Sequence, residues 1–163
     1  MKTVIILIVT IAGLIGILAL FGAVNTGSNQ PSENSGPAVL SAAEDSFDFG
    51  TISMAAGPVK HEFVIKNTAE KEITITSIYT SCMCTEAVLK VNGGSFGPFG
   101  MPGHGAITRV NKKLGNGQEA AVEVVFDPAA HGPAGVGQIE RAVYLENDSG
   151  TPLMLLIKAM VTP

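Results

Sequence analysis

The sequence predicts an all-β domain, built as a sandwich of two packed sheets and preceded by one N-terminal transmembrane helix. Three observations carry this prediction. Residues 4–24 are apolar and uncharged, residues 25–45 are rich in Asn, Ser, Gly and Pro, and apolar residues alternate with polar ones from Ser46 onward. No stretch after Ser46 shows a comparable helical period. We therefore divide the 163 residues into an anchor (1–24), a flexible linker (25–45) and one domain (46–163).

The apolar run from Val4 to Val24 is long enough to cross a membrane. A helix over these uncharged residues, at about 1.5 Å per residue, spans roughly 30 Å, the thickness of the hydrocarbon core. Lys2 flanks the run, and positive charge stays on the cytoplasmic side. We expect a single-pass signal anchor in the cell membrane, with the C-terminal domain outside the cytoplasm. A cleaved signal peptide is the alternative, although large residues occupy the position two before each small residue at the exit.

Composition and charge exclude several classes of partner and activity. The chain has 10 Lys and Arg residues against 14 Asp and Glu residues, and no basic stripe that would bind nucleic acid. No carboxylate pair, Ser/His/Asp set or phosphate-binding loop occurs in a recognisable context. We therefore expect no enzyme, no catalytic residue and no nucleic-acid partner. The expected partners are the membrane, through the N-terminal helix, and a protein or another component of the cell envelope.

Alternation of apolar and polar residues places the strands. In chain order they are expected at 47–50, 59–66, 73–80, 86–89, 118–126, 138–146 and 153–161. A break in the alternation predicts a β-bulge beside Ser77, and Asn147–Gly150 is a turn signal. About seven short strands of this kind are typical of an immunoglobulin-like antiparallel sandwich. The inward positions predict one core made of Phe63, Ile65, Ile75, Val122, Val124, Phe126, Val143, Leu155 and Ile157.

Two glycine-rich segments interrupt this pattern. Residues 92–117 contain many glycines around Phe99, Met101 and His104, and residues 131–137 begin with His131. We expect each to be a loop. Long loops without secondary structure of their own are often functional, so the two histidines become candidate site residues.

Several short motifs follow one another in a fixed order. They are Phe49-Gly50-x-Ile52, Phe63-x-Ile65-x-Asn67, Ile73-x-Ile75, Ser81-Cys82-Met83-Cys84-Thr85 and Val124-x-Phe126-Asp127-Pro128, followed by Gly135 and a Leu-rich closing strand. From Phe47 to Val161 this order resembles the bacterial domain of unknown function 1573 family. The resemblance implies one immunoglobulin-like domain, exported or tethered outside the cytoplasm and related in shape to the ASH domains of ciliary and centrosomal proteins. Met83 stands where the family more often has Gly, and residues 92–117 are longer than the family's short turn.

Cys82 and Cys84 are the two cysteines of the chain, and three hypotheses for them stay open. The first is that they are small buried hydrophobic residues, the second that they bind a metal ion, and the third that they are the thiols of a redox centre. In an extended segment, residues i and i+2 project to the same side with Cα atoms about 6.5–7 Å apart. A disulfide would need a closer approach, and it would be strained and easily reduced.

The metal hypothesis adds donors from the two glycine-rich segments. Cys82, Cys84, His104, Met101 and His131 form a soft donor set suited to Cu(I) or Zn(II). The thioether of Met101 favours copper over zinc. We therefore predict a membrane-tethered extracytoplasmic binding or structural module, with a copper- or zinc-binding protein as the alternative and a thiol-redox factor as the second alternative.

Two further polar residues fall on inward strand positions. His61 shares its face with Phe63, and we interpret it as a residue of the core or its rim. Arg141 shares its face with Val143, and we expect its stem to cover one end of the sandwich while its guanidinium pairs with an acidic residue.

Overall fold

Ten strands and two short 3-10 helices make up residues 36–104 and 108–163, the part of the chain that the computed structural model describes. The strands are β1 (Leu40–Ala42), β2 (Ser46–Ser53), β3 (Val59–Asn67), β4 (Ile73–Thr80), β5 (Thr85–Val91), β6 (Gly94–Phe99), β7 (Arg109–Leu114), β8 (Glu119–Phe126), β9 (Gly137–Asn147) and β10 (Leu153–Thr162). The 3-10 helices are η1 (Met54–Ala56) and η2 (Gly132–Gly135). Neither of these helices has the length and apolar character needed to cross a membrane. The expected anchor over residues 1–24 lies outside the described residues.

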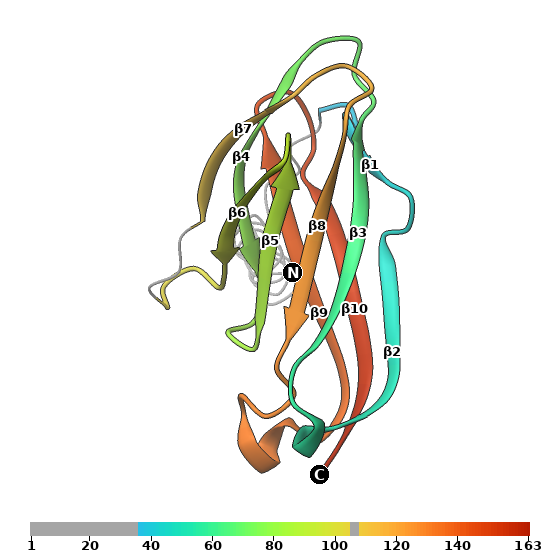
Figure 1. Cartoon of the computed structure of the whole chain (residues 1–163), viewed down its shortest axis with the longest axis vertical. Helices are drawn as coiled ribbons and strands as arrows, with labels where there is room; N and C mark the ends of the chain where they lie inside the picture. The colour runs from blue at the N-terminus through green and yellow to red at the C-terminus, as the bar shows by residue number, and fades with distance from the viewer. Residues whose placement is uncertain (1–35, 105–107) are drawn as a thin grey trace, which may run out of the picture. The chain divides into compact units, whose positions relative to one another are not determined.

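The strands form two five-stranded sheets that pack face to face (Figure 1). Sheet A has the order β1-β3-β8-β5-β6, and sheet B has the order β2-β10-β9-β4-β7. The predicted all-β sandwich is therefore confirmed, although the described residues form ten strands and not about seven. The expectation of a wholly antiparallel arrangement is wrong at one place, because β2 runs parallel to β10. Strand β1 pairs with β3 in sheet A. The chain then crosses to sheet B, where β2 runs beside β10 in the same direction.

Strand β1 lies inside the stretch that the sequence indicated as linker. Val39 and Leu40 are 6% and 5% exposed, and they pack into the main core. Three residues of β1 pair with β3, from Leu40 opposite Asn67 to Ala42 opposite Ile65. An apolar pair this short carries no period, so alternation alone did not separate it from the linker.

The core between the sheets contains all nine residues predicted for it. Each of them is at most 3% exposed. Strand β8 lies in the middle of sheet A, where Val124 faces His61 of β3 on one side and Ala87 of β5 on the other. The predicted bulge is also present, since the register of β4 against both β7 and β9 shifts between Ile75 and Ser77.

The first glycine-rich segment, expected to be a loop, contains two strands. Val91 pairs with Gly94, and the intervening Asn92 and Gly93 both have positive φ (55° and 75°). This geometry matches a two-residue type I′ hairpin turn, for which Asn-Gly is a preferred sequence. Glycine is also required at Gly97, where φ is 126° and an added Cβ would lie 2.8 Å from the carbonyl oxygen of Ala87. The glycines of this segment therefore allow β6 to pair closely with β5, and this part of the segment is a strand and not a loop.

One fully buried polar residue joins β3 to the turn between β7 and β8. Asn67 is 0% exposed, and its side-chain amide donates to the carbonyl oxygens of Leu114, Gly115 and Lys71 at 2.8, 3.0 and 2.9 Å. Its side-chain oxygen accepts from the backbone N–H of Ala69 at 2.8 Å. These bonds satisfy the amide completely, as a buried polar group requires.

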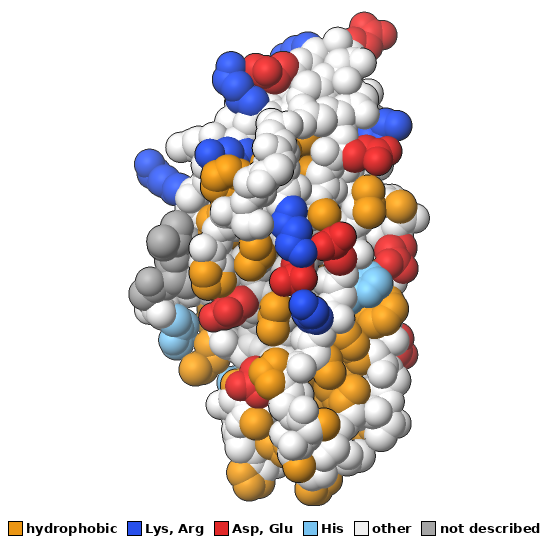
Figure 2. Space-filling model, viewed as in Figure 1, with side chains coloured by type: hydrophobic (Ala, Val, Ile, Leu, Met, Phe, Trp, Pro, Cys, Tyr) orange, Lys and Arg blue, Asp and Glu red, His pale blue; other side chains and the backbone are white. Residues whose placement is uncertain are grey.

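The outer face of sheet A carries charges of both signs, and Figure 2 shows them interspersed. Lys90 of β5 contacts Glu62 of β3 at 2.8 Å and Glu123 of β8 at 3.0 Å, and Lys60 lies 3.5 Å from Glu123. The ion pairs cross three neighbouring strands, so this face presents no field of a single sign.

Candidate functional site

Cys82 and Cys84 lie in the short turn that joins β4 of sheet B to β5 of sheet A. Thr80 ends β4, and its buried hydroxyl lies 2.9 Å from the carbonyl oxygen of Cys82 and 3.0 Å from that of Thr85. The backbone N–H of Thr85 also donates to the carbonyl oxygen of Cys82, at 3.1 Å. These bonds fold the chain back on itself between the two cysteines, so the segment is not extended.

The two cysteines form a disulfide with their Cα atoms 5.3 Å apart. The expected separation for an extended segment is wrong, because the turn shortens it into the usual range for disulfides. The backbone N–H of Cys84 donates to Cys82 Sγ at 3.4 Å and closes the turn further. The pair is therefore brought together by the local backbone rather than by distant packing.

The turn is fixed to both sheets. Ser81 exchanges two 2.9 Å hydrogen bonds with Ala142 of β9, one through its backbone N–H and one through its hydroxyl. On the other side, the backbone N–H of Asp127 donates to the carbonyl oxygen of Cys84 at 2.9 Å. Such double attachment holds the disulfide in one position relative to β8 and β9.

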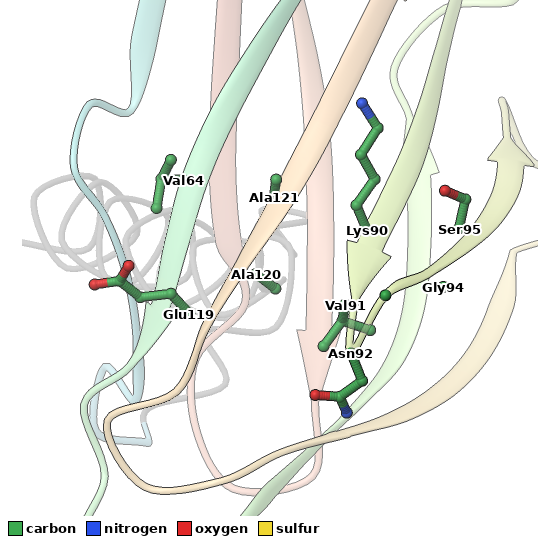
Figure 3. A pocket seen from close by; sticks show the side chains of 10 residues that line it. Val64, Lys90, Val91, Asn92, Gly94, Ser95, Glu119, Ala120 and Ala121 are labelled. Atoms are coloured by element: carbon green, nitrogen blue, oxygen red, sulfur yellow. The ribbon is translucent and has the colours of Figure 1, made fainter.

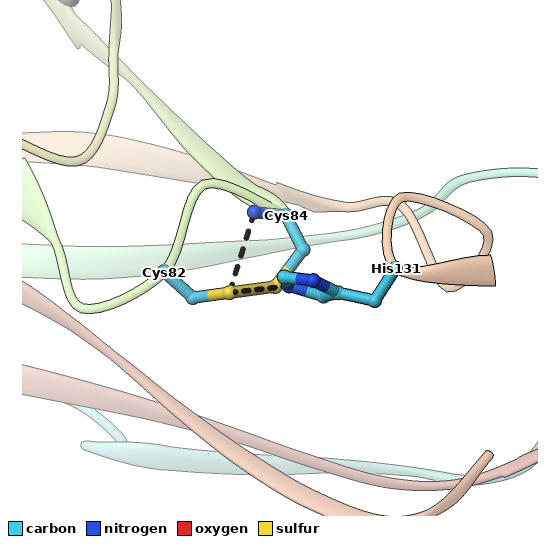
Figure 4. Close-up of side chains that lie close together, drawn as sticks. All are labelled: Cys82, Cys84 and His131. Carbon is cyan, nitrogen blue, oxygen red and sulfur yellow. Dashed lines mark hydrogen bonds between the residues drawn. A yellow bond between two sulfur atoms is a disulfide. The ribbon is translucent and has the colours of Figure 1, made fainter. Parts of the chain in front are cut away.

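The two sulfur atoms have different surroundings. Cys84 is 3% exposed, and its Sγ lies 3.4 Å from Arg141 Nε and 3.7 Å from the Thr85 hydroxyl. Cys82 is half-buried, and its Sγ lies 3.1 Å from Nε2 of the exposed His131 (Figure 4). Because a disulfide sulfur carries no proton, the imidazole N–H is the donor in this contact. The site thus has one buried sulfur beside a guanidinium and one half-buried sulfur beside an imidazole.

The segment between β8 and β9 positions His131. The Asp127 carboxylate accepts from the backbone N–H of Ala129 at 2.8 Å, and Gly132 N–H donates to the carbonyl oxygen of Ala129 at 2.9 Å. These turns place His131 immediately before η2, which begins at Gly132. The histidine therefore comes from a compact turn, although the sequence indicated an open loop.

The structure gathers three of the five predicted metal donors. The donor atoms of Cys82, Cys84 and His131 all lie within 4.8 Å of one another. His104 is exposed on the turn after β6 and is not a member of this group. Met101 is half-buried and follows Gly100, whose carbonyl oxygen accepts from Thr80 N–H at 3.2 Å. Met101 therefore lies on the segment that borders the end of β4, and its role as a ligand stays a prediction.

Sequence reasoning did not assign Arg141 to this site. Its guanidinium contacts Cys84 Sγ and, at 2.9 Å, the carbonyl oxygen of Glu140. The sequence predicted an acidic side chain as its partner. The available signal was its inward parity on β9, which is unusual for arginine. His61 packs as expected for a rim residue: its ring stacks on Phe47 with centroids 3.6 Å apart, and its Nε2 contacts Glu44.

A separate hollow of about 490 Å³ opens on the outer face of sheet A (Figure 3). It is lined by Val64, Glu119, Ala121 and the turn that follows Lys90. Lys90 and the turn residues lie at the end of β5 opposite Cys84. The hollow is therefore distinct from the cysteine site.

Comparison with solved structures shows the fold. A protein of unknown function from Porphyromonas gingivalis W83 aligns with a TM-score of 0.55 and 14% identity over 81% of this chain and 51% of that protein. The Vibrio cholerae VesB protease aligns with a TM-score of 0.50 and 16% identity over 76% of this chain and 32% of that protein. The chain thus spans about half of the first structure and about a third of the second. The ASH/PapD-like domain 7 of human CEP192 aligns with a TM-score of 0.45 and 12% identity over 76% of this chain and 85% of that domain.

Comparison by sequence matches one part of the chain to a family model. No curated protein matches. The family model described as "Protein of unknown function (DUF1573)" matches residues 40–92, a range that runs from β1 to the hairpin turn after β5 and includes both cysteines. The resemblance to the domain of unknown function 1573 family is therefore confirmed over residues 40–92.

Proposed function

We propose that this chain is a membrane-tethered module outside the cytoplasm and that its Cys82–Cys84 pair exchanges electrons with the thiols of a partner protein. The observation that carries the proposal is the difference between the two sulfurs. Cys82 is half-buried beside His131, whereas Cys84 is buried beside Arg141. A more exposed sulfur for the attack, paired with a sheltered, charge-stabilised leaving sulfur, is the arrangement that favours thiol–disulfide exchange.

The exchange starts when a partner thiolate attacks Cys82 Sγ. A bond forms between the partner sulfur and Cys82, the Cys82–Cys84 bond breaks, and its electron pair leaves on Cys84 Sγ. Arg141 Nε–H, already 3.4 Å away, stabilises this thiolate with a charge-assisted hydrogen bond. A second partner thiolate then attacks the partner sulfur of the mixed disulfide and releases Cys82 as a thiolate. The partner dithiol becomes a disulfide, and the two cysteines take protons from solvent and become thiols.

Two further features support the location and the partner class. Disulfides persist in oxidising compartments outside the cytoplasm, which agrees with residues 1–24 acting as a membrane anchor. Met83 stands between the two cysteines and is 53% exposed. Its thioether offers an apolar, adaptable contact to an incoming protein surface, so we propose a protein rather than a small thiol as the partner.

Single-cysteine variants test the assignment of the two sulfurs. Cys84→Ser leaves the half-buried Cys82 thiol, and Cys82→Ser leaves the buried Cys84 thiol. We expect the Cys82 thiol to form mixed disulfides at least about tenfold faster with an aromatic disulfide reagent, because both exposure and the neighbouring imidazole favour it. The measurement is the rate of thiol release at one pH, with circular dichroism as a control for folding.

The unmodified pair must also respond to a redox buffer while the domain is folded. Incubation with dithiol and disulfide mixtures, followed by alkylation and mass measurement, gives the reduction potential. A pair that stays oxidised until the domain unfolds would contradict the proposal and return the cysteines to the structural role. Equal reactivity of the two single-cysteine variants would contradict the assigned order of attack.

A further inference from the structure

We infer that the reduced pair and His131 form a three-coordinate site for one Cu(I) ion, with Arg141 as its counter-charge. The ligands are Cys82 Sγ, Cys84 Sγ and His131 Nε2. This inference rests on one part of the proposed function, namely that the pair can be reduced while the domain stays folded. It adds a second ligand class for the same cysteines and restricts the donor set that the sequence suggested.

The donor atoms lie within a few tenths of an ångström of the spacing that one ion allows. All three lie within 4.8 Å of one another, and His131 Nε2 lies 3.1 Å from Cys82 Sγ. Metal–sulfur and metal–nitrogen bonds of about 2.0–2.3 Å hold two donors of the same ion up to roughly 4.6 Å apart. Once the disulfide is reduced, rotation of the half-buried Cys82 side chain separates the sulfurs and opens the space between them.

The charges of the site select a monovalent ion. Two thiolates and one Cu(I) ion carry a single net negative charge, and Arg141 beside Cys84 neutralises it. With Zn(II) the two thiolates would already be neutralised, and Arg141 would leave an unbalanced positive charge next to the ion. Soft thiolates also suit Cu(I). The positive charge of the guanidinium next to Cys84 therefore favours the monovalent ion.

The number of donors points the same way. Structural zinc sites are almost always four-coordinate, whereas the described residues supply a group of three such donors. His104, the other histidine predicted for this site, is not in the group. Binding proceeds with balanced charge: one Cu(I) ion displaces the protons of two thiols, and both protons go to solvent.

Cu(I) titration of the reduced chain tests the site. The purified chain is reduced with a dithiol, freed of it without oxygen, and titrated against a chromogenic Cu(I) chelator. We expect one ion per chain. His131→Ala should weaken binding by about 100-fold or more, because loss of a ligand should exceed the effect of losing an outer-shell partner. His104→Ala is the matched control and should leave affinity unchanged within about twofold.

Arg141→Gln separates the counter-charge from the ligands. This variant keeps a polar side chain and should weaken Cu(I) binding by about tenfold, the size of an outer-shell effect, while the ion-to-chain ratio stays the same. Both histidines are exposed, so their variants are expected to fold. X-ray absorption of the copper-loaded chain should show two sulfur neighbours and one nitrogen neighbour.

Several results would overturn the inference. A reduced, folded chain that binds no Cu(I) would refute it, as would equal losses in His131→Ala and His104→Ala. A third sulfur neighbour would replace the three-donor site with one that includes Met101. If thiol exchange proceeds normally in a chain that binds no copper, only the copper site fails. If the pair cannot be reduced in the folded chain, both proposals fail.

Discussion

Val124 offers a stringent test of the assigned core, since the same atoms can be removed from an outer position on the neighbouring strand. Val124 is 0% exposed in the middle of β8, and Val64 of β3 is 42% exposed. Val124→Ala and Val64→Ala each remove two methyl groups. Any difference between the variants therefore reports the environment and not the chemistry of the change.

The expected magnitude follows from burial. Two buried methyl groups contribute about 1.6 kcal/mol of transfer free energy. The space left behind adds to this cost, because β3 and β5 flank Val124 on both sides and limit collapse. We expect Val124→Ala to lower the free energy of unfolding by about 2–3 kcal/mol. For Val64→Ala we expect less than about 1 kcal/mol, mostly from lost β-propensity.

Thermal unfolding followed by circular dichroism measures the difference. For a domain of this size about 1 kcal/mol corresponds to roughly 3–4 °C. Val124→Ala should then melt about 6–12 °C below the parent, and Val64→Ala within about 4 °C of it. Val124→Asp, which buries an unpaired charge, should not fold at 25 °C. Equal shifts for the two alanine variants would refute the assignment of inward and outward faces.

Three further predictions concern the buried amide, an acidic turn and the topology. Asn67→Ala leaves buried carbonyls without their donor and should cost about 2–4 kcal/mol in denaturant unfolding; a cost below that of Val64→Ala would contradict the hydrogen-bond assignment. Asp148 has a pKa lowered from its ordinary value, first by the hydrogen bond from Thr74 N–H and then by the Ser149 hydroxyl. The stabilising effect of the Asp148 carboxylate should be present above its unfolded-state pKa and lost as pH falls through its folded-state pKa. The difference in melting temperature between the parent and Asp148→Asn should therefore shrink in acid. A difference that stays constant with pH would contradict this assignment. Protease added to intact cells should remove the folded domain, whereas a protected domain or a mature N-terminus near Val24 would contradict the tethered topology.

The fold could be predicted where a strand has one buried face. In β3, inward Phe63 and Ile65 alternate with outward Glu62 and Val64, and this alternation is set by the same burial that the structure shows. Strand β6 could not be recognised in this way, because its core-facing Phe96 and Phe99 are three positions apart and glycines interrupt any alternation around them. Its hairpin turn at Asn92–Gly93 was a readable signal that the density of glycines obscured.

The candidate site could be predicted in its components but not in its assembly. The chemistry of Cys82, Cys84 and His131 is visible in the sequence. Their grouping depends on a contact between residues 49 positions apart, and the contact of Arg141 with Cys84 spans 57 positions. Only the pairing order of the strands decides which loops share an end of the sandwich. The turn itself was misjudged because a local hydroxyl, that of Thr80, bends a segment whose flanks are strands.

The parallel pairing of β2 with β10 determines how the domain resists a mechanical pull. When force is applied between the segment before β2 and the C-terminus, the two strands are drawn in opposite directions along their common axis. Their register extends from Leu156 opposite Ser46 to Thr162 opposite Ser53, and the Ser53 hydroxyl also lies 2.8 Å from the carbonyl oxygen of Pro163. All of these bonds share the load in shear, whereas an antiparallel pair of terminal strands would open one bond at a time. The rate of forced unfolding is therefore governed by simultaneous rupture along a whole strand.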